Sequence, residues 1–317
     1  MKQAEKIKTP RLGYLYVVIA ALLWAISGSS AKFLFHSGVS PFQLVQLRLT
    51  ISTGLLFLVL LIWRRNLMRI KQGDLFYFVF FGAVVMAAVQ FTYLFAISKI
   101  NVAAAILLQY LAPVFIAIYS FVFAKEKPGL ITILSIAGAI TGCYLVVGAY
   151  NLNLFSLNKT GIIAGILSAI AFAWYSVHGE YGMRKYDPVT VLFFALLFAA
   201  ITWNVLHPPL EAFFHTRSLL QWGLIFYIGI FGTVIPFGFY FEGINLIRST
   251  RASITGTLEP ISAAAISYFF LNEILEPLQM AGGIMVIAAI ILLQFKVEYD
   301  DKTPDLVRTQ NLEKSDK

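Results

Sequence analysis

The sequence predicts an all-α membrane protein with ten transmembrane helices, built as a 5+5 inverted-topology repeat. Three observations support this prediction. Of the 317 residues, 59% are hydrophobic and only 13% are charged, whereas soluble domains carry about a quarter charged residues. The charges lie between long apolar runs, and one sixteen-residue apolar stretch occurs twice, 147 residues apart.

Ten apolar segments are long enough to cross a membrane, because a hydrocarbon core of about 30 Å requires about 20 apolar residues per helix. They lack the alternation of outer-membrane strands and are too long for them. The first is too long, and too polar at its end, for a cleaved signal peptide. The segments are 12–35, 42–63, 75–97, 102–124, 129–149, 161–180, 188–206, 219–244, 250–271 and 277–296.

The distribution of charge predicts the orientation of the chain. If the N-terminus is cytoplasmic, 19 of the 24 lysines and arginines fall in cytoplasmic segments, which is the positive-inside pattern. The net charge of +8 is therefore explained without nucleic-acid binding, and an even number of helices places both termini in the cytoplasm. We expect residues 1–11 to be a cytoplasmic N-terminus and residues 297–317 a disordered cytoplasmic tail.

The repeated stretch reads LAPVFIAIYSFVFAKE at 111–126 and LEPISAAAISYFFLNE at 258–273. Weaker matches at similar offsets divide the chain into a first half, 12–149, and a second half, 161–296, joined by an external linker, 150–160. Because five helices is an odd number, the second half crosses the membrane in the opposite direction. Inverted repeats of this kind are typical of secondary transporters.

These features together resemble the EamA branch of the drug/metabolite transporter superfamily. The resemblance rests on the two five-helix halves, on a tryptophan in the first helix of each half, and on a proline and a glutamate thirteen residues apart that close each fourth helix. It covers nearly all of residues 10–296, so each half resembles one EamA repeat. It implies an inner-membrane carrier without an ATP-binding part, commonly an exporter of amino acids or related metabolites, and it leaves the substrate open.

Two charged residues lie inside predicted helices, where an ionisable side chain is costly and indicates function. Glu259 is about 13 Å along the ninth helix, near the midplane, and Pro260 beside it predicts a broken helix. Its carboxylate would bind a substrate ammonium or a proton; a neutral, hydrogen-bonded structural carboxyl is the alternative. Arg48, about 9 Å from the external end of the second helix, would bind a substrate carboxylate or serve the structure by pairing with an acid or reaching the interface.

Trp24 and Trp174 occupy similar positions in the first helix of each half. Both are too deep for the interfacial aromatic belt. We expect them to form walls of a central cavity, with large packing side chains as the equal alternative.

Further polar side chains inside the predicted helices need partners in lipid and should face the interior of the bundle. Each could line the cavity or make a hydrogen bond between helices. These candidates are Tyr93, Gln90, Gln109, Tyr110, Tyr175 and Tyr240.

Four residues near helix ends are candidates for gates. Glu126 and Glu273 close the fourth helix of each half and lie on opposite sides of the membrane, so they cannot form one paired-acid site. A structural role at the start of the following helix is the alternative. His178 and Glu242 lie near the cytoplasmic ends of the sixth and eighth helices, where they could contribute to an inner gate or be solvated.

Gly138 and Gly142, spaced as small-xxx-small, permit close helix contact within the chain or between chains. A homo-oligomer is thus possible but not required. The lone Cys143 is expected to be a small packing residue. The four histidines have no metal-ligand spacing and no nucleotide-binding loop is found, so we expect no cofactor and no enzyme activity.

The sequence therefore predicts a secondary active transporter, expected to export amino acids or similar zwitterions by alternating access around a midplane cavity. Proton-coupled efflux of lipophilic cations or drugs is the alternative. An intramembrane enzyme would need acidic, histidine or serine residues gathered near one headgroup plane, and a channel would need charge rings or a carbonyl filter. The sequence indicates neither. The bilayer and a small-molecule substrate are the expected partners, and the location is a bacterial inner membrane.

Overall fold

The computed structural model describes residues 9–100, 102–151, 158–206, 208–271, 276–295 and 302–315. Within these ranges every regular element is helical, as the composition predicts. Seven helices are long and apolar enough to cross a membrane, and two shorter apolar helices accompany them. The chain is an integral membrane protein, and each of the ten predicted segments coincides with helical structure.

The first half contains eight helical elements. They are α2 (Thr9–His36), α3 (Pro41–Trp63), α4 (Leu75–Phe80), η3 (Phe81–Met86), α5 (Ala87–Lys99), α6 (Val102–Gln109), α7 (Ala112–Val122) and α8 (Leu130–Val146). Short 3-10 turns at Arg65–Met68, Gln72–Asp74 and Ala149–Asn151 connect or follow them.

The second half contains seven helical elements and is followed by one more helix. The second-half elements are α9 (Lys159–Met183), α10 (Pro188–Leu206), α11 (Leu219–Gly229), η7 (Ile230–Val234), α12 (Ile235–Gly256), α13 (Leu258–Leu271) and α14 (Pro277–Phe295). A 3-10 turn at Glu211–Phe213 lies between α10 and α11, and α15 (Pro304–Ser315) follows α14.

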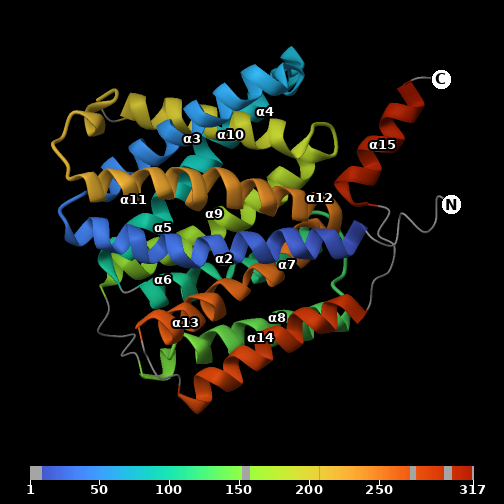
Figure 1. The fold of residues 1–317 in the computed structure, drawn as a ribbon. Coiled ribbons are helices and arrows are strands. Elements are labelled where there is room, and N and C mark those ends of the chain that lie inside the picture. The colour runs from blue at the N-terminus through green and yellow to red at the C-terminus, as the bar shows by residue number, and fades with distance from the viewer. Residues whose placement is uncertain are drawn as a thin grey trace.

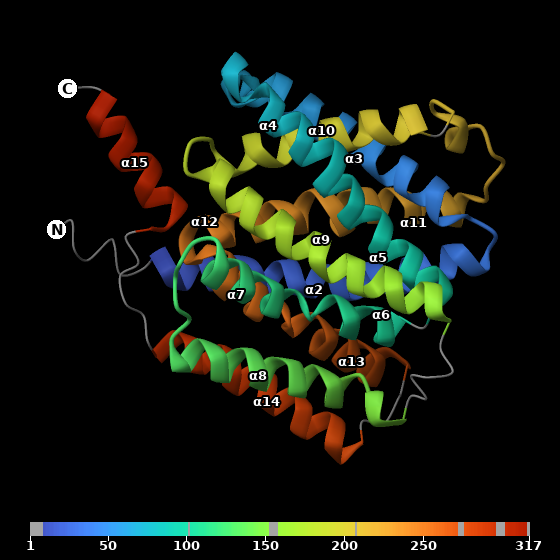
Figure 2. The same cartoon turned by 180° about the vertical axis from the view of Figure 1, so that it is seen from behind.

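The two halves interleave rather than standing apart. α2 of the first half packs along α12 of the second, α5 packs against α9, and α3 packs against α10. Figures 1 and 2 show these helices side by side in one bundle, with α8 and α14 paired along its edge. The end of the bundle where α2 begins and α15 lies is called the terminal face below, and the other end the opposite face.

The pairing of α8 with α14 depends on glycine. A side chain at Gly142 would come within 2.8 Å of the Gly282 carbonyl, and one at Gly282 within 2.7 Å of the Gly142 carbonyl. A Cβ at Gly138 would lie 3.5 Å from Ala289, also on α14. The small-residue motif of the first half is therefore used for contact within the chain.

Both repeated stretches begin at a helix break. Tyr110 and Leu111 separate α6 from α7, and Thr257 separates α12 from α13. A proline follows each break within the first turn of the next helix, where its missing N–H and fixed φ are tolerated. The break predicted beside Pro260 is thus confirmed, and it places Glu259 in the first turn of α13.

A second irregularity also occurs in both halves. η3 and η7 are π-helical turns inside the long helices that begin at Leu75 and Leu219. π turns inside α-helices widen the backbone ladder and are frequent at functional sites. In η7 the Thr233 hydroxyl donates to the Ile228 carbonyl at 2.8 Å.

The structure corrects the prediction of a disordered tail over 297–317. Residues 304–315 form α15, which packs against α9 and α12. The Arg308 guanidinium donates to the carbonyls of Met183 (2.7 Å) and Tyr186 (3.1 Å) at the end of α9. Carbonyls at a helix C-terminus lack intrahelical partners and attract cations, so one arginine anchors a segment whose low hydrophobicity alone indicates disorder. Of the rest of the predicted tail, residues 297–301 and 316–317 lie outside the described residues.

Candidate functional site

One cavity in the bundle gathers most of the predicted site residues. Its volume is about 40 Å³. Seven predicted residues line it, together with seven that were not predicted. The lining consists of Trp24, Ser27, Gly28, Arg48, Val89, Gln90, Tyr93, Leu94, Gln109, Tyr110, Phe172, Gly232, Phe237 and Glu259.

The cavity lies in the half of the bundle away from the terminal face. Trp24 and Gly28 are in the second half of α2, which begins at the terminal face, and Arg48 is early in α3, which begins at the opposite face. The break before α13 brings Glu259 to the same depth. The π turn η7 and the helix α13, which follows the break at Thr257, each contribute a residue to the cavity wall.

Glu259 is buried and held by two tyrosines of the first half. The Tyr110 hydroxyl donates to Glu259 Oε2 at 2.7 Å, and the Tyr93 hydroxyl donates to Oε1 at 3.3 Å. A carboxylate with two such donors is oriented and still has acceptor capacity left. It can therefore accept a hydrogen bond from an ammonium group in the cavity, or take up a proton.

Arg48 is also buried and is held by the π turn η7. Its Nε and Nη2 donate to Thr233 Oγ1 at 3.0 and 2.9 Å, and Nη2 also donates to the Gly232 carbonyl at 3.1 Å. No carboxylate pairs with Arg48 in the described part of the chain, so the predicted alternative of an internal acid is not found there. Nη1 is left for a ligand, and a guanidinium is suited to a carboxylate.

Two further polar groups of the lining are poorly satisfied by the described residues. The buried indole N–H of Trp24 has no hydrogen-bond partner among them. The buried amide of Gln90 donates only to the Met86 sulfur, at 3.7 Å. Because buried polar groups are normally paired, these donors indicate a site that a ligand or water completes. The cavity thus combines a carboxylate, a guanidinium and aromatic walls.

Three predicted lining residues lie elsewhere. Trp174 is 42% exposed on the outer surface of α9, against Phe80 and His178. The helix turns Trp174 outward at a position where α2 turns Trp24 inward, so the expectation that both tryptophans wall the cavity is wrong for Trp174. Phe172, two residues earlier, lines the cavity instead and packs edge-on against Trp24.

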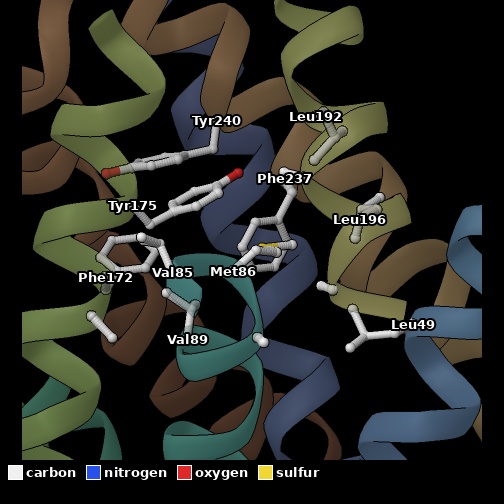
Figure 3. Close-up of a cluster of buried hydrophobic side chains, with 14 of the residues drawn as sticks. Leu49, Val85, Met86, Val89, Phe172, Tyr175, Leu192, Leu196, Phe237 and Tyr240 are labelled. Atoms are coloured by element: carbon white, nitrogen blue, oxygen red, sulfur yellow. The ribbon is translucent and has the colours of Figure 1, made fainter. Parts of the chain in front are cut away.

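Tyr175 and Tyr240 are fully buried behind the lining, in an aromatic cluster with Phe172 and Phe237 that Figure 3 displays. The Tyr240 ring lies 5.4 Å from the Trp24 ring, and its hydroxyl bonds Ser176 at 2.9 Å. These two tyrosines support the cavity wall rather than face the cavity. The alternative of a hydrogen bond between helices describes Tyr240, whereas the buried Tyr175 hydroxyl has no hydrogen-bond partner among the described residues.

A second polar cluster lies toward the terminal face and is called the ionic latch below. Arg248 is its centre: Nε contacts Glu180 Oε1 at 3.0 Å, and Nη2 contacts Glu126 Oε2 at 3.0 Å. The backbone N–H and the hydroxyl of Ser249 donate to Glu180 Oε2 at 2.8 and 2.6 Å. Lys302 reaches Glu126 at 2.9 Å. The latch ties α12 to α9, to the loop after α7 and to the tail.

The backbone of Arg248 has φ 67° and ψ 164°, which interrupts α12. Such a conformation is costly for a residue with a side chain and persists where the surroundings impose it. Burial pushes the pKa of Glu126 upward, but Lys302 and Arg248 outweigh burial and hold the pKa of this carboxyl below its ordinary value. Glu126 is therefore ionised at neutral pH and is part of a network of charges.

The structure describes two of the other three gate candidates, His178 and Glu242. Glu273 lies outside the described residues. The His178 ring stacks on Tyr77 with centroids 5.1 Å apart, and Glu242 is half-buried on α12. The latch contacts given above involve neither of these two side chains.

Sequence reasoning missed several residues of both sites. Glu180 is an acid at the end of an apolar segment, and that signal could have identified it. Arg248 was counted only for its charge, because nothing in the sequence predicts the break in α12. Gly232 and Thr233 contact Arg48 because they lie in the π turn η7, and no local sequence pattern predicts that turn.

Comparison with known proteins gives consistent results. The sequence profile of the EamA-like transporter family matches residues 11–148 and 159–295. The uncharacterized inner membrane transporter YicL of Salmonella typhimurium is 28% identical over 289 residues, covering 89% of this chain and 95% of that protein. The pseudopaline exporter CntI of Pseudomonas aeruginosa is 23% identical over 287 residues, covering 89% and 95%.

One solved crystal structure has a TM-score of 0.68 to this chain at 18% identity, covering 89% of this chain and 96% of that one. At this identity the likeness concerns the fold alone. The shared architecture extends over nearly the whole described bundle.

Proposed function

We propose, from the premise that the chain belongs to the EamA-like transporter family, that this membrane transporter exports small zwitterions such as amino acids. The observation that carries the proposal is the presence of Arg48 and Glu259 in the lining of one cavity. A zwitterion would place its carboxylate on the guanidinium and its ammonium on the carboxylate held by Tyr93 and Tyr110. The naming of one relative as an exporter supports outward transport.

The mechanism we propose is alternating access in a ten-helix inverted repeat. With the terminal face in the cytoplasm, as the positive-inside pattern indicates, the cavity lies in the external half and the ionic latch lies on the cytoplasmic side of it. The latch would then close the cytoplasmic route in this conformation. Release of Arg248 from Glu126 and Glu180 would let the two halves rock and expose the cavity to the cytoplasm.

The cavity is small in this conformation, so the walls would have to move outward to bind an amino acid. Trp24 and Phe237, whose rings meet edge-on at 5.1 Å, are the side chains between which such an opening would develop. The direction of net transport follows from the gradients of the substrate and any coupling ion.

Efflux of a lipophilic cation is the second candidate. It is favoured by the aromatic walls, because cations are attracted to aromatic faces, and by a guanidinium already bonded to Thr233 and Gly232. In that case Glu259 would exchange a proton for the cation. The remaining Nη1 of Arg48 in the lining would oppose a cationic ligand, which makes this candidate the weaker one.

The test is counterflow in proteoliposomes that contain the full chain. Labelled amino acids and a lipophilic cation are offered in parallel at several pH values, to the parent protein and to Glu259→Gln. Amino-acid counterflow that is lost in the variant supports the zwitterion proposal. Movement of the cation alone, linked to a pH gradient, would replace it with proton-driven cation efflux. If neither moves, the amino-acid proposal fails.

A further inference from the structure

A second cavity lies at the terminal face, between the start of α4, the end of α9 and the tail helix α15. Its volume is about 780 Å³. It is therefore much larger than the central cavity, and it shares no lining residue with it. Nothing in the transport mechanism above uses it.

Basic side chains outnumber acidic ones in the lining of this basal cavity. Lys71, Arg184, Lys185 and Arg308 line it, against the single carboxylate of Asp74. They come from three separate parts of the chain: the loop before α4, the end of α9 and the tail. Convergence of like charges from distant segments is costly unless an anion is shared among them.

The hydrogen bonds show which of these cations a ligand can reach. Arg308 is used by Asp305 and by backbone carbonyls, and Arg184 pairs with Glu180 at 3.3 Å. Lys185 places one N–H on Asp74 at 2.5 Å and has two more. The Lys71 ammonium has no ion-pair partner among the described residues. Lys71 and Lys185, at the mouth, are thus the groups with donors to offer.

Aromatic side chains place the cavity at the depth of lipid headgroups. Tyr181 lines it and is 65% exposed. Trp63 and Phe76, at the helix ends that flank the same loop, are 77% and 80% exposed. Exposed aromatic rings at helix ends are typical of the membrane interface, so the mouth of the cavity opens where phosphate groups of a leaflet would lie.

We propose that the basal cavity binds a phosphate group, contributed by an anionic lipid or by a soluble phosphate, through Lys71 and Lys185. Basic pockets between helices on the cytoplasmic side bind anionic headgroups in membrane proteins. The headgroup depth rests on the orientation proposed above, whereas binding itself does not. Because α15 forms one wall, an occupied cavity also stabilises the docked tail.

The experiment measures lipid retention by native mass spectrometry and thermal unfolding of the full chain in detergent. The probes are phosphatidylglycerol, phosphatidylcholine and inorganic phosphate. The variants are Lys71→Gln and Lys185→Gln. The matched control is Arg11→Gln, which removes one exposed charge from the same face, outside the cavity.

We expect phosphatidylglycerol to be retained and to raise the unfolding temperature, with phosphatidylcholine much weaker. Each lysine variant should weaken binding about fivefold, as expected for one basic residue near an anionic surface, and Arg11→Gln should leave it unchanged. Stabilisation by inorganic phosphate that both lysine variants weaken, without lipid retention, would identify a soluble phosphate as the ligand and also support the site.

Equal binding of every probe by the parent, the lysine variants and the control would overturn the proposal. The measurement requires no transport. A chain that binds phosphatidylglycerol through Lys71 but moves no amino acid would therefore overturn the transport proposal alone.

Discussion

The two family-matched halves share their irregular backbone features and differ in the side chains that meet the central cavity. Each half has a π turn in its third long helix and a break before the proline of its repeated stretch. In contrast, Glu259 corresponds to Ala112, and the inward Trp24 corresponds to the outward Trp174. In the proposed function, the shared features build the scaffold and the unshared side chains bind the substrate. Unequal effects of substitution at corresponding positions are therefore expected.

The largest effect is expected at Glu259. Glu259→Gln keeps the shape and the tyrosine contacts but removes the charge, and loss of a hydrogen bond to a charged group lowers affinity about 10-fold or more. Counterflow rates of labelled amino acids in proteoliposomes measure this. Glu276→Gln is the control, because that acid is exposed and bonds Tyr150 away from the cavity. If Glu259→Gln transports amino acids at the parental rate, the Glu259 carboxylate does not bind the substrate.

Arg48 should be second. Arg48→Lys keeps the charge but loses the fork that spans Thr233 and Gly232, so we expect amino-acid transport to fall about 10-fold. Uptake of a lipophilic cation by the same variant distinguishes a role of Arg48 in binding the substrate carboxylate from a role in the fold. If both substrates are affected equally while the protein also unfolds at lower temperature, Arg48 serves the fold rather than the substrate carboxylate.

The two tryptophans form a matched pair for the third prediction. Trp24→Phe deletes the unpartnered indole N–H from the cavity and should raise the KM about fivefold, the effect of one hydrogen bond. Trp174→Phe changes a ring on the outer surface and should leave the KM within about twofold. Concentration dependence of initial transport rates measures both. Similar changes in the two variants would mean that the halves contribute symmetrically after all.

A smaller, conformational effect is expected at the ionic latch. Among the described residues, no corresponding cluster of charges is seen at the opposite face. Arg248→Gln removes both ion pairs, so the central cavity should become more accessible from the terminal face. Cysteines introduced at Ser27 in a Cys143→Ser background can be labelled from each side of vesicles of known orientation. Lys127→Gln, in the loop after α7, is the control. Labelling that does not change in Arg248→Gln would show that the latch does not gate.

The smallest effect is expected from pH. Because the pKa of Glu126 is lowered in the folded protein, its stabilisation is complete above the ordinary glutamate pKa of about 4.3 and is lost as pH falls through the lower, folded value. Labelling of the cysteine at position 27, in the Cys143→Ser protein with an intact latch, should thus be constant between about pH 5.5 and 8. Opening of the parent protein within that window would mean that another group controls the gate.

The bundle was largely predictable because apolar length, charge asymmetry and the repeat are all local or periodic properties of the sequence. Glu259 and Arg48 were predictable for the same reason: a charge in an apolar run is conspicuous. The sequence did not predict on which side of α9 Trp174 lies, because α9 is apolar around much of its circumference. The order of α15 depends on acceptors at the end of α9, more than 100 residues earlier, and no local pattern contains that contact.

The π turn η7 contains one residue more than an α-helical turn would need. Each residue of an α-helix advances the chain by about 100°, and the wider π turn absorbs the extra residue, so deleting one residue between Ile230 and Val234 would return this segment to a regular α-helix. The Gly232 carbonyl would return to the regular ladder, and Arg48 would lose an acceptor. The guanidinium would keep Thr233 as an acceptor and would have more N–H capacity to offer to the contents of the cavity. If Arg48 binds the substrate as proposed, the number of residues in this one turn therefore sets how strongly the Gly232 carbonyl competes with the substrate for the arginine.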